Sequence, residues 1–483
     1  GNTYYVSVDG YMNATGTFSV TANDGSVIIP STQDCAGAVA VCSAVISQPT
    51  SFFGCGAVND VPPSGSFGNP NINPSSTNSG CLLTNELNTV WYNITISSNG
   101  NLAWTVLPAV NGYYDWTLYP KTTNTCADIA NNTVAPVRCN WNCTSIGGTG
   151  MQTVANIPVG GTACNFESPL PVTAGQTYVL CLSNYSGTAG GFVLDFSNST
   201  AGIAAPTSLT WTGSTSTAWA LNSNWGMCTP PVCGIDAMIV ASANQPVISA
   251  NASVRSLTIA TGATLTINPG VTLTICGDLN VFGNLIASPT STILFNNGST
   301  VQNITGMLTG ANAVGNLTIT KTGGSVILNN NIDIAGAFTT SSATSVFNTT
   351  GKYVRVGGNF VNSTGNTTFA NTGTTGTLEF YGAASQTYNQ GSSQLDLNFV
   401  TMNHTGPGVT LQTNMFIKTV TGSLTLTLGK IITGANEVRV MNTTPACVST
   451  GNTTSYVEGF LRRWVLTGSY DFPVGEVVKG YER

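Results

Sequence analysis

The sequence has 483 residues, with 19 acidic and 13 basic side chains, one histidine and a formal net charge of −6. Charged residues make up 7% of the chain, against about 25% in an average soluble domain. The basic residues are scattered, with Arg462 and Arg463 as the one adjacent pair, so the chain lacks the positive surface that nucleic-acid binding requires. A single histidine also excludes a multi-histidine zinc site.

The first 29 residues are expected to form a β-hairpin. Residues 1–11 match residues 175–185 without a gap, and each copy holds two alternating runs around a polar turn. The later copy would close a β-sandwich. We therefore expect residues 1–29 to be the closing hairpin of a preceding, truncated sandwich.

Residues 33–200 are predicted to form one antiparallel β-sandwich, because short alternating runs are separated by turns and no capped helical pattern occurs. The alternating runs cover residues 91–96, 102–106, 115–119, 176–182 and 191–196. Residues 61–80, rich in proline, glycine, asparagine and serine, are expected to form a long loop.

The cysteines indicate an oxidising compartment. Of 13 cysteines, nine lie between residues 33 and 200, with irregular spacing and no CxxC pair, so disulfides are expected rather than zinc. We expect Cys126 to be bridged to Cys139, because the two bracket a loop between strands. The rest of the sandwich connectivity stays open.

Three of the four cysteines beyond the sandwich lie near one another in sequence. Cys228 and Cys233 flank a Thr-Pro-Pro-Val turn, and we expect them to close a small local loop. Cys276 lies in an alternating strand and is expected to be a buried free thiol.

Residues 203–470 are predicted to form a parallel β-solenoid of about ten coils. Apolar residues alternate strictly with threonine or asparagine, as in Ala263-Thr-Leu-Thr-Ile. The motifs Ala335-Gly-Ala-Phe and Gly357-Gly-Asn-Phe are 22 residues apart, about one coil. A longer similarity, about 85 residues apart, links Thr292-Ile-Leu-Phe with Thr377-Leu-Glu-Phe. An array of β-sandwiches is the alternative.

The two ends of the solenoid have distinct sequences. Trp211, Trp219 and Trp225 are expected to plug its N-terminal end, where the core would otherwise be open. Residues 471–483 are expected to begin a further, truncated β segment.

Several of these motifs resemble those of a known family. Asp34-Cys-Ala-Gly-Ala, Asn88-Thr-Val-Trp-Tyr-Asn-Ile-Thr-Ile, Tyr114-Asp-Trp-Thr-Leu-Tyr and Val172-Thr-Ala-Gly-Gln-Thr-Tyr-Val-Leu resemble the sandwich modules of very large Bacteroidota surface proteins, which are related to the pre-peptidase C-terminal domain. Thr210-Trp-Thr-Gly, followed by Trp219 and Asn224-Trp225, is similar to a segment of the same proteins. The family is exported by type IX secretion and includes gliding-motility adhesins. The resemblance implies an extracellular, cell-surface location. No sorting domain of that family is recognised, so the secretion route stays open.

Acidic side chains are the candidate catalysts, because some β-helices cleave acidic polysaccharides with clustered aspartates beside a basic residue. Stacked coils could bring two carboxylates together at the separation that glycoside hydrolysis uses. We nevertheless expect solvated or turn carboxylates and no catalytic residue. The solenoid carboxylates are Asp236, Asp278, Asp333, Glu379, Asp396, Glu437 and Glu458.

Other candidate ligand sites are few. No EF-hand loop occurs, and we expect no cofactor, with Ca2+ at Asp9 or Asp115 as the alternative. His404 is expected at the surface, near a turn. The aromatic cluster of Tyr113, Tyr114, Trp116 and Tyr119 could stack on a sugar ring. Alternation places Tyr114 and Trp116 on the same face of the strand, however, and one of the two faces is expected to belong to the core.

The sequence thus predicts an all-β chain, a Cys-rich antiparallel sandwich followed by a parallel β-helix. We expect a non-enzymatic stalk or adhesin segment outside a bacterial cell, without membrane insertion because no apolar run reaches about 18 residues. Its partners would be surface glycans or copies of itself. The alternatives are a polysaccharide-active β-helix enzyme with a carbohydrate-binding module, and a subunit of an extracellular filament.

Overall fold

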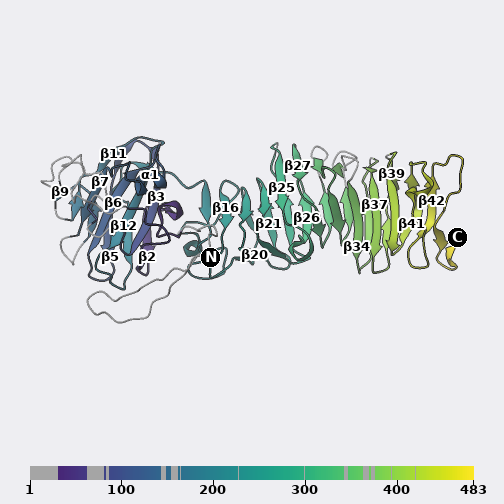
Figure 1. Ribbon diagram of the computed structural model, residues 1–483, viewed down its shortest axis with the longest axis horizontal. Coiled ribbons are helices and arrows are strands. Elements are labelled where there is room, and N and C mark those ends of the chain that lie inside the picture. Colours follow the sequence, from purple (N-terminus) through teal and green to yellow (C-terminus); the bar gives the residue numbers. More distant parts are fainter. Residues whose placement is uncertain are drawn as a thin grey trace, which may run out of the picture. The chain divides into compact units, whose positions relative to one another are not determined.

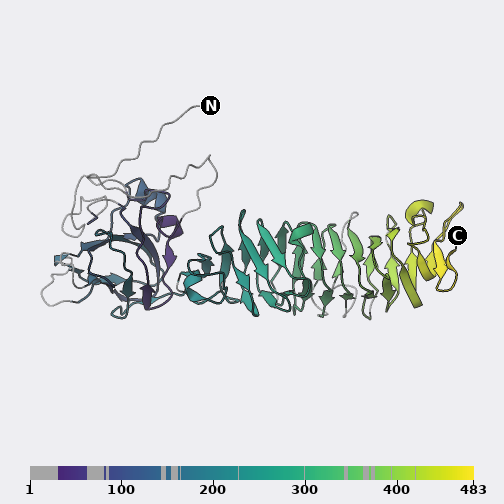
Figure 2. The same cartoon turned by 90° about the horizontal axis from the view of Figure 1, so that it is seen from below.

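A computed structural model describes most of the chain as two compact units (Figures 1 and 2). The first unit contains Ser47–Gly202 and the described residues up to Val39, and the second contains Ala40–Ile46 and the residues from Ile203 onward. The hairpin expected over residues 1–29 lies outside the described residues. These are 31–61, 81–82, 86–142, 148–153, 162–163, 165–226, 228–298, 300–341, 346–362, 369–370, 376–392, 394–418 and 420–482.

The first unit is a β-sandwich, as predicted. Sheet A has the order β1-β3-β12-β6-β7 with β14 beside β3, sheet B has the order β2-β13-β5-β8-β10-β9, and β4 pairs with β11. The strands of sheet A are β1 (Val39–Ala40), β3 (Thr89–Ser98), β6 (Tyr114–Pro120), β7 (Arg138–Trp141), β12 (Thr177–Asn184) and β14 (Gly202–Ile203). The others are β2 (Val45–Gln48), β4 (Gly100–Leu102), β5 (Trp104–Pro108), β8 (Thr149–Met151), β9 (Thr162–Ala163), β10 (Phe166–Glu167), β11 (Leu170–Val172) and β13 (Phe192–Asp195).

Large aromatic side chains fill the space between the two sheets. Trp116 of β6 contacts Trp104 of β5 with ring centroids 5.0 Å apart. Tyr114 contacts Phe192 of β13 at 5.5 Å. All four side chains are buried, so the alternating residues of β6 that face sheet B belong to the core.

The outer face of sheet A is buried as well. Trp91 of β3 and Cys181 of β12 are cross-strand partners, and they pack with Tyr119 and with Ile129 of helix α1 (Cys126–Ala130). The helix starts at Thr125, whose side chain forms a capping box with Asp128. Because both faces are covered, β6 is buried over six successive residues, and its polar–apolar alternation alone could not separate core from surface.

Four disulfides join described cysteines, and they include all four candidates, but both predicted pairings are wrong. The first connection, between β6 and β7, holds helix α1 rather than a simple loop. The helix carries Cys126 to the segment before β1, whereas Cys139 lies on β7 itself. The disulfides are Cys35–Cys126, Cys42–Cys228, Cys81–Cys139 and Cys233–Cys276.

Side-chain direction explains the second wrong pairing. Cys228 is buried in the core of the second unit, whereas Cys233 is exposed on the other side of the turn. Cys276, expected as a free thiol, follows the inward-facing Ile275 and therefore points outward, where it pairs with Cys233. The free cysteines among the described residues are Cys55, Cys181 and Cys447.

The second unit is the predicted parallel β-solenoid, with about nine turns. Its strands stack in chain order along the unit (Figures 1 and 2) and form three faces. Face 1 contains β15 (Ser208–Thr210), β16 (Asp236–Ile239), β19 (Leu257–Ile259), β22 (Leu279–Val281), β25 (Gln302–Gly306), β27 (Ser325–Leu328), β30 (Val346–Asn348) and β33 (Phe369–Ala370).

Face 2 has two stretches separated by a 3-10 turn at Gly310–Asn312. Its strands are β17 (Val247–Ile248), β20 (Thr264–Ile267) and β23 (Asn284–Ala287), then β28 (Ile332–Ile334), β31 (Tyr353–Val356), β34 (Thr377–Gly382), β37 (Phe399–His404) and β40 (Ser423–Leu428).

Face 3 contains the longest series of strands and ends in an antiparallel pair. Its strands are β18 (Ala252–Val254), β21 (Thr272–Ile275), β24 (Thr292–Phe295), β26 (Asn316–Ile319), β29 (Phe338–Thr340), β32 (Phe360–Asn362), β35 (Gln386–Asn389), β38 (Val409–Leu411), β41 (Ile431–Val440), β42 (Val457–Arg463), β43 (Val474–Glu476) and β44 (Gly480–Glu482). Two further strands, β36 (Asp396–Leu397) and β39 (Met415–Ile417), lie off this path; they pair with each other, and β39 pairs with Val438–Val440 at the end of β41.

The coil spacing agrees with the 22-residue motif. Ile334 of β28 pairs with Val356 of β31, so the two glycine motifs follow each other on successive coils. The 85-residue similarity behaves differently, because β24 lies on face 3 and β34 on face 2. This similarity therefore reflects the shared pattern of strands and turns, not superimposable positions in the coil.

The N-terminal end of the solenoid is closed by the three tryptophans, as predicted. Trp225 contacts Trp219 and Trp211 at 4.8 and 5.0 Å between ring centroids, and its indole N–H donates to the Trp219 carbonyl at 2.7 Å. All three belong to the apolar core of the second unit. At the other end, β43 pairs in parallel with β42 and antiparallel with β44.

Replacing both Cys35 and Cys126 with serine should lower the free energy of unfolding of the sandwich. The bridge spans 91 residues, and closing a loop of that length in the unfolded chain is worth about 4 kcal/mol. Urea denaturation followed by tryptophan fluorescence would measure the change. The exposed free Cys55 offers the control, since C55S should leave the midpoint unchanged; equal losses in both variants would contradict the assignment.

Candidate functional site

The proposed sugar-stacking cluster is not one surface. Tyr114 and Trp116 face sheet B and Tyr119 packs under helix α1, and all three are buried. Only Tyr113 is available, with 38% of its surface exposed. The cluster as predicted is therefore wrong for those three residues, because both faces of β6 are covered.

A second tyrosine joins Tyr113 at the end of sheet A. The pairing of β12 with β6 ends at Asn184 and Tyr114, and Tyr185 follows in the turn after β12. The Tyr113 amide donates to the Ser186 hydroxyl at 2.6 Å. This hydrogen bond links the residue before β6 to the turn after β12. Tyr185 is 43% exposed. Its position follows from strand register, which sequence patterning did not supply.

Asp115 lies on the outer face of sheet A, two residues after Tyr113. Its cross-strand partners are Ser183 of β12 and Trp141 of β7. Asp115 is 5% exposed, and burial raises the pKa of its carboxyl to about 7. No described residue donates a hydrogen bond to this carboxylate or forms an ion pair with it. Asp9, the other suggested Ca2+ ligand, lies outside the described residues.

Glu86 and Asp60 are also buried on the sandwich, but both have hydrogen-bond donors. Glu86 accepts from the Trp91 indole at 2.7 Å and from the Val61 amide, and burial raises its pKa to about 7. Asp60 accepts from the Cys35 amide at 2.7 Å, and burial raises its pKa too. These two carboxyls fasten the segment around the Cys35 disulfide to the sheet.

The solenoid brings two of its scattered carboxylates to one arginine. Asp333, Arg355 and Glu379 occupy matching positions on β28, β31 and β34. Arg355 lies 3.1 Å from Asp333 and 3.1 Å from Glu379. The two carboxylate side chains are 5% and 6% exposed. We call these three residues the Arg355 ladder.

Aromatic and amide groups surround the Arg355 ladder. The Tyr353 hydroxyl donates to Glu379, and Asn403 donates to the same carboxylate at 3.2 Å. The guanidinium lies over the Tyr381 ring, 4.3 Å from its centroid. The Asp333 carboxylate also accepts from the Gly310 amide at 2.8 Å. Both carboxylates are therefore bound by several donors within the fold.

Each of the other candidate carboxylates in the solenoid has a partner as well. Asp278 accepts from the Asn303 amide at 2.7 Å. The other four carboxylates form ion pairs. These are Asp236–Arg255, Asp396–Lys418, Glu458–Lys430, and Glu437 with Arg439 and Arg462. Asp333 and Glu379 are therefore buried, contrary to the expectation of solvated or turn carboxylates, whereas Asp236 and Asp396 keep 35% and 44% of their side chains exposed.

His404 is buried, not at the surface as expected. Its Nδ1 accepts from the Gly406 amide at 3.0 Å, so Nε2 carries the proton and donates to the Ala384 carbonyl at 2.9 Å. The imidazole joins two turns of successive coils. It has no carboxylate or thiol partner in the described structure, and its role is to satisfy backbone groups.

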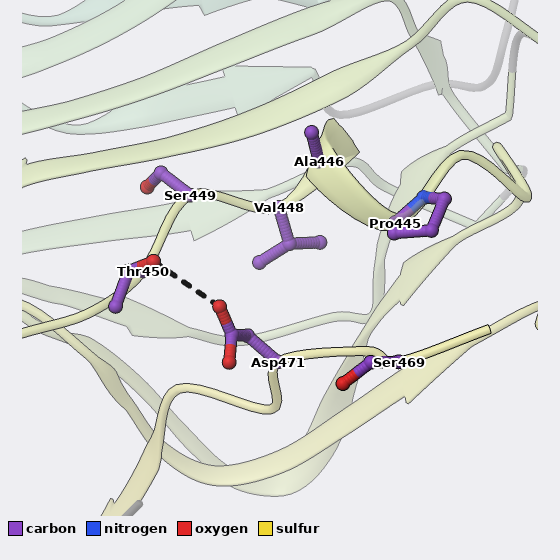
Figure 3. Close-up of a pocket in the computed structure, with 7 residues that line it drawn as sticks. All are labelled: Pro445, Ala446, Val448, Ser449, Thr450, Ser469 and Asp471. Atoms are coloured by element: carbon purple, nitrogen blue, oxygen red, sulfur yellow. Dashed lines mark hydrogen bonds between the residues drawn. The ribbon is translucent and has the colours of Figure 1, made fainter.

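A cavity of about 320 Å³ lies beside the last coil (Figure 3). The Thr450 hydroxyl donates to the Asp471 carboxylate at 3.1 Å across it. Its lining residues are Pro445, Ala446, Val448, Ser449, Thr450, Ser469 and Asp471. The polar groups of the lining side chains are hydroxyls and the Asp471 carboxylate, which already accepts the hydrogen bond from Thr450. Among the described residues, no second charged side chain lines this cavity.

Within the described ranges, no group of three or more histidine, cysteine, aspartate or glutamate side chains is arranged to hold a metal ion. No helix of the described part is long and apolar enough to cross a membrane. The disulfides indicate that the chain folds in an oxidising environment.

Comparison with known proteins adds one match. Residues 210–406 match a domain of unknown function, DUF8693. The matched segment starts at the tryptophan cap and continues through β37. No curated protein and no solved structure matches the chain significantly.

Replacing Arg355 with methionine should destabilise the solenoid strongly. The substitution leaves the buried carboxylates of Asp333 and Glu379 without their counter-ion, a change that typically costs about 3–5 kcal/mol. The matched control is K418M, because the Lys418–Asp396 pair is nearly half exposed and such pairs contribute at most about 1 kcal/mol. Thermal melts monitored by circular dichroism would compare them, and equal melting temperatures for the two variants would contradict the prediction.

The stability difference between D115N and the wild type should depend on pH. The folded-state pKa of Asp115 is raised to about 7, while an unfolded aspartate has a pKa of about 3.9. The unfolded chain therefore releases this proton first, and the wild type loses stability as pH rises from about 4 to about 7.

The D115N variant lacks that loss, so its melting temperature should match the wild type near pH 4 and exceed it near pH 8. Glu86 affects both proteins alike. Scanning calorimetry across this range would measure the gap, and a gap independent of pH would argue against a buried, unpaired Asp115.

Proposed function

We propose that this chain is a non-enzymatic structural and adhesive segment of a large bacterial surface protein, presented outside the cell. The observation that carries the proposal is the Arg355 ladder. Asp333 and Glu379 are the pair of solenoid carboxylates best placed for catalysis, and both form ion pairs with the same guanidinium. The disulfides support an extracellular location. The polar outer columns of threonine and asparagine suit a surface that must stay in water with few charges.

A polysaccharide-active enzyme is the second candidate, and the same ladder is what favours it. Adjacent coils are about 4.8 Å apart, so Asp333 and Glu379 belong to strands about 10 Å apart. This is close to the carboxylate separation of inverting glycosidases, about 6.5–9.5 Å. Tyr353 and Tyr381 could border a sugar ring there.

A glycan panel separates the two functions. The structural role predicts no release of reducing ends from neutral or acidic polysaccharides by the wild-type chain at any pH between 4 and 9. Release by the wild type that is lost in both D333N and E379Q, with the K418M variant fully active, would establish the enzyme instead. Thermal melts of each variant would show that a loss of activity is not a loss of fold.

A further inference from the structure

We propose that the end of sheet A binds an organic ammonium group, with the Asp115 carboxylate as its counter-ion and aromatic rings around it. The site consists of Asp115, Tyr113, Tyr185 and Trp141. It is independent of the structural role proposed above, so either proposal can fail without the other.

Strand register assembles this site from three strands. Trp141 of β7 is the direct partner of Asp115, and direct partners share one face with Cβ atoms about 5 Å apart. Tyr113 precedes Asp115 by two residues, which in an extended chain is the same face. Tyr185 lies beside Tyr113 through the contact of their strand ends. Register thus places Trp141 directly beside Asp115, and two tyrosines lie at the same end of the sheet.

The Asp115 carboxylate lacks the donors that buried carboxylates normally have. Its neighbour Ser183 donates its hydroxyl to the Leu87 carbonyl at 2.7 Å, not to Asp115. In the same cross-strand row, the buried Thr89 hydroxyl oxygen has no hydrogen-bond partner. Glu86, on the same sandwich, shows the contrast, since it accepts three hydrogen bonds. A buried carboxylate without a partner is costly, and a cation would remove that cost.

An ammonium group fits these surroundings better than a metal ion. Calcium takes about six to eight oxygen ligands, and aromatic rings supply none. Ring faces attract organic cations electrostatically. Tyr113 and Tyr185 are each about two-fifths exposed, so their rings are accessible to a ligand. The ammonium could come from a lysine side chain, a choline group or an amino sugar.

Titration of the full chain with paired probes tests the proposal. Isothermal calorimetry and tryptophan fluorescence would compare choline with its neutral isostere 3,3-dimethylbutan-1-ol, and glucosamine with N-acetylglucosamine. A lysine-containing peptide and its acetyl-lysine form would test the protein source. The charged member of at least one pair should bind at least tenfold more tightly than the neutral member, and its affinity should fall as salt rises.

Variants locate the binding. D115N should weaken binding at least tenfold, and Y113A and Y185A several-fold each. The matched control is D195N, since Asp195 lies on the same sandwich and accepts from the Ser197 amide at 2.8 Å; it should bind like the wild type. Melting curves of every variant would confirm that it is folded.

Three outcomes would overturn the proposal. Equal binding of glucosamine and N-acetylglucosamine would make the site a neutral sugar platform. Calcium binding that is lost in D115N and insensitive to Y113A would make it a metal site. No binding of any charged probe at concentrations up to about 10 mM would show that Asp115 is simply a protonated core residue.

Discussion

The backbone hydrogen bonds between successive coils determine the organisation of the solenoid. Along each face, strands pair in parallel register with those of neighbouring coils, as Leu257 pairs with Leu279 and Leu279 with Ile304. Parallel register stacks equivalent positions directly above one another. Inward positions therefore form apolar columns, and outward positions form columns of threonine and asparagine. Like charges at neighbouring places in such a column repel at the strand spacing of about 4.8 Å, so they need a counter-ion between them, as Glu437 provides for the directly paired Arg439 and Arg462.

This constraint accounts for how the few charges are placed. Asp333, Arg355 and Glu379 alternate in sign along one column. Lys321, which is fully buried, has no acid beside it and instead donates to Gln302 at 2.7 Å and to the Thr300 carbonyl at 2.9 Å. Burial lowers the pKa of this lysine, and neutral oxygens hold it at the corner of its coil. The few ionisable groups of this chain thus stabilise contacts between successive coils.

The sequence predicts the solenoid better than it predicts the sandwich site. Strict alternation and the 22-residue spacing suffice for coils, because each coil contacts only its neighbours and local pattern determines the local structure. The tryptophan cap was predictable for the same reason. Disulfide pairing was not, since Cys126 and Cys139 are close in sequence but are carried apart by helix α1.

The sandwich residues show a second limit of patterning. Alternation correctly placed Tyr114 and Trp116 on one face, but it could not show that helix α1 covers Tyr119 on the other. Tyr185 and Trp141 join Asp115 only through the register of distant strands. Such long-range pairing leaves no periodic signal in a single sequence, so the candidate site emerged only from the structure.

The Cys233–Cys276 disulfide has a mechanical consequence. Cys233 precedes β16, and Cys276 directly follows β21. The bridge therefore encloses a segment of 43 residues, about two coils. A solenoid pulled from its ends would lose coils one at a time, because each coil is held mainly by its neighbours. The segment between the two cysteines could not add to the end-to-end length of the pulled chain, even after its coils unfold. About 150 Å of extended chain would become available only when the bridge is reduced. The maximum extension of this solenoid therefore depends on the redox state of its surroundings.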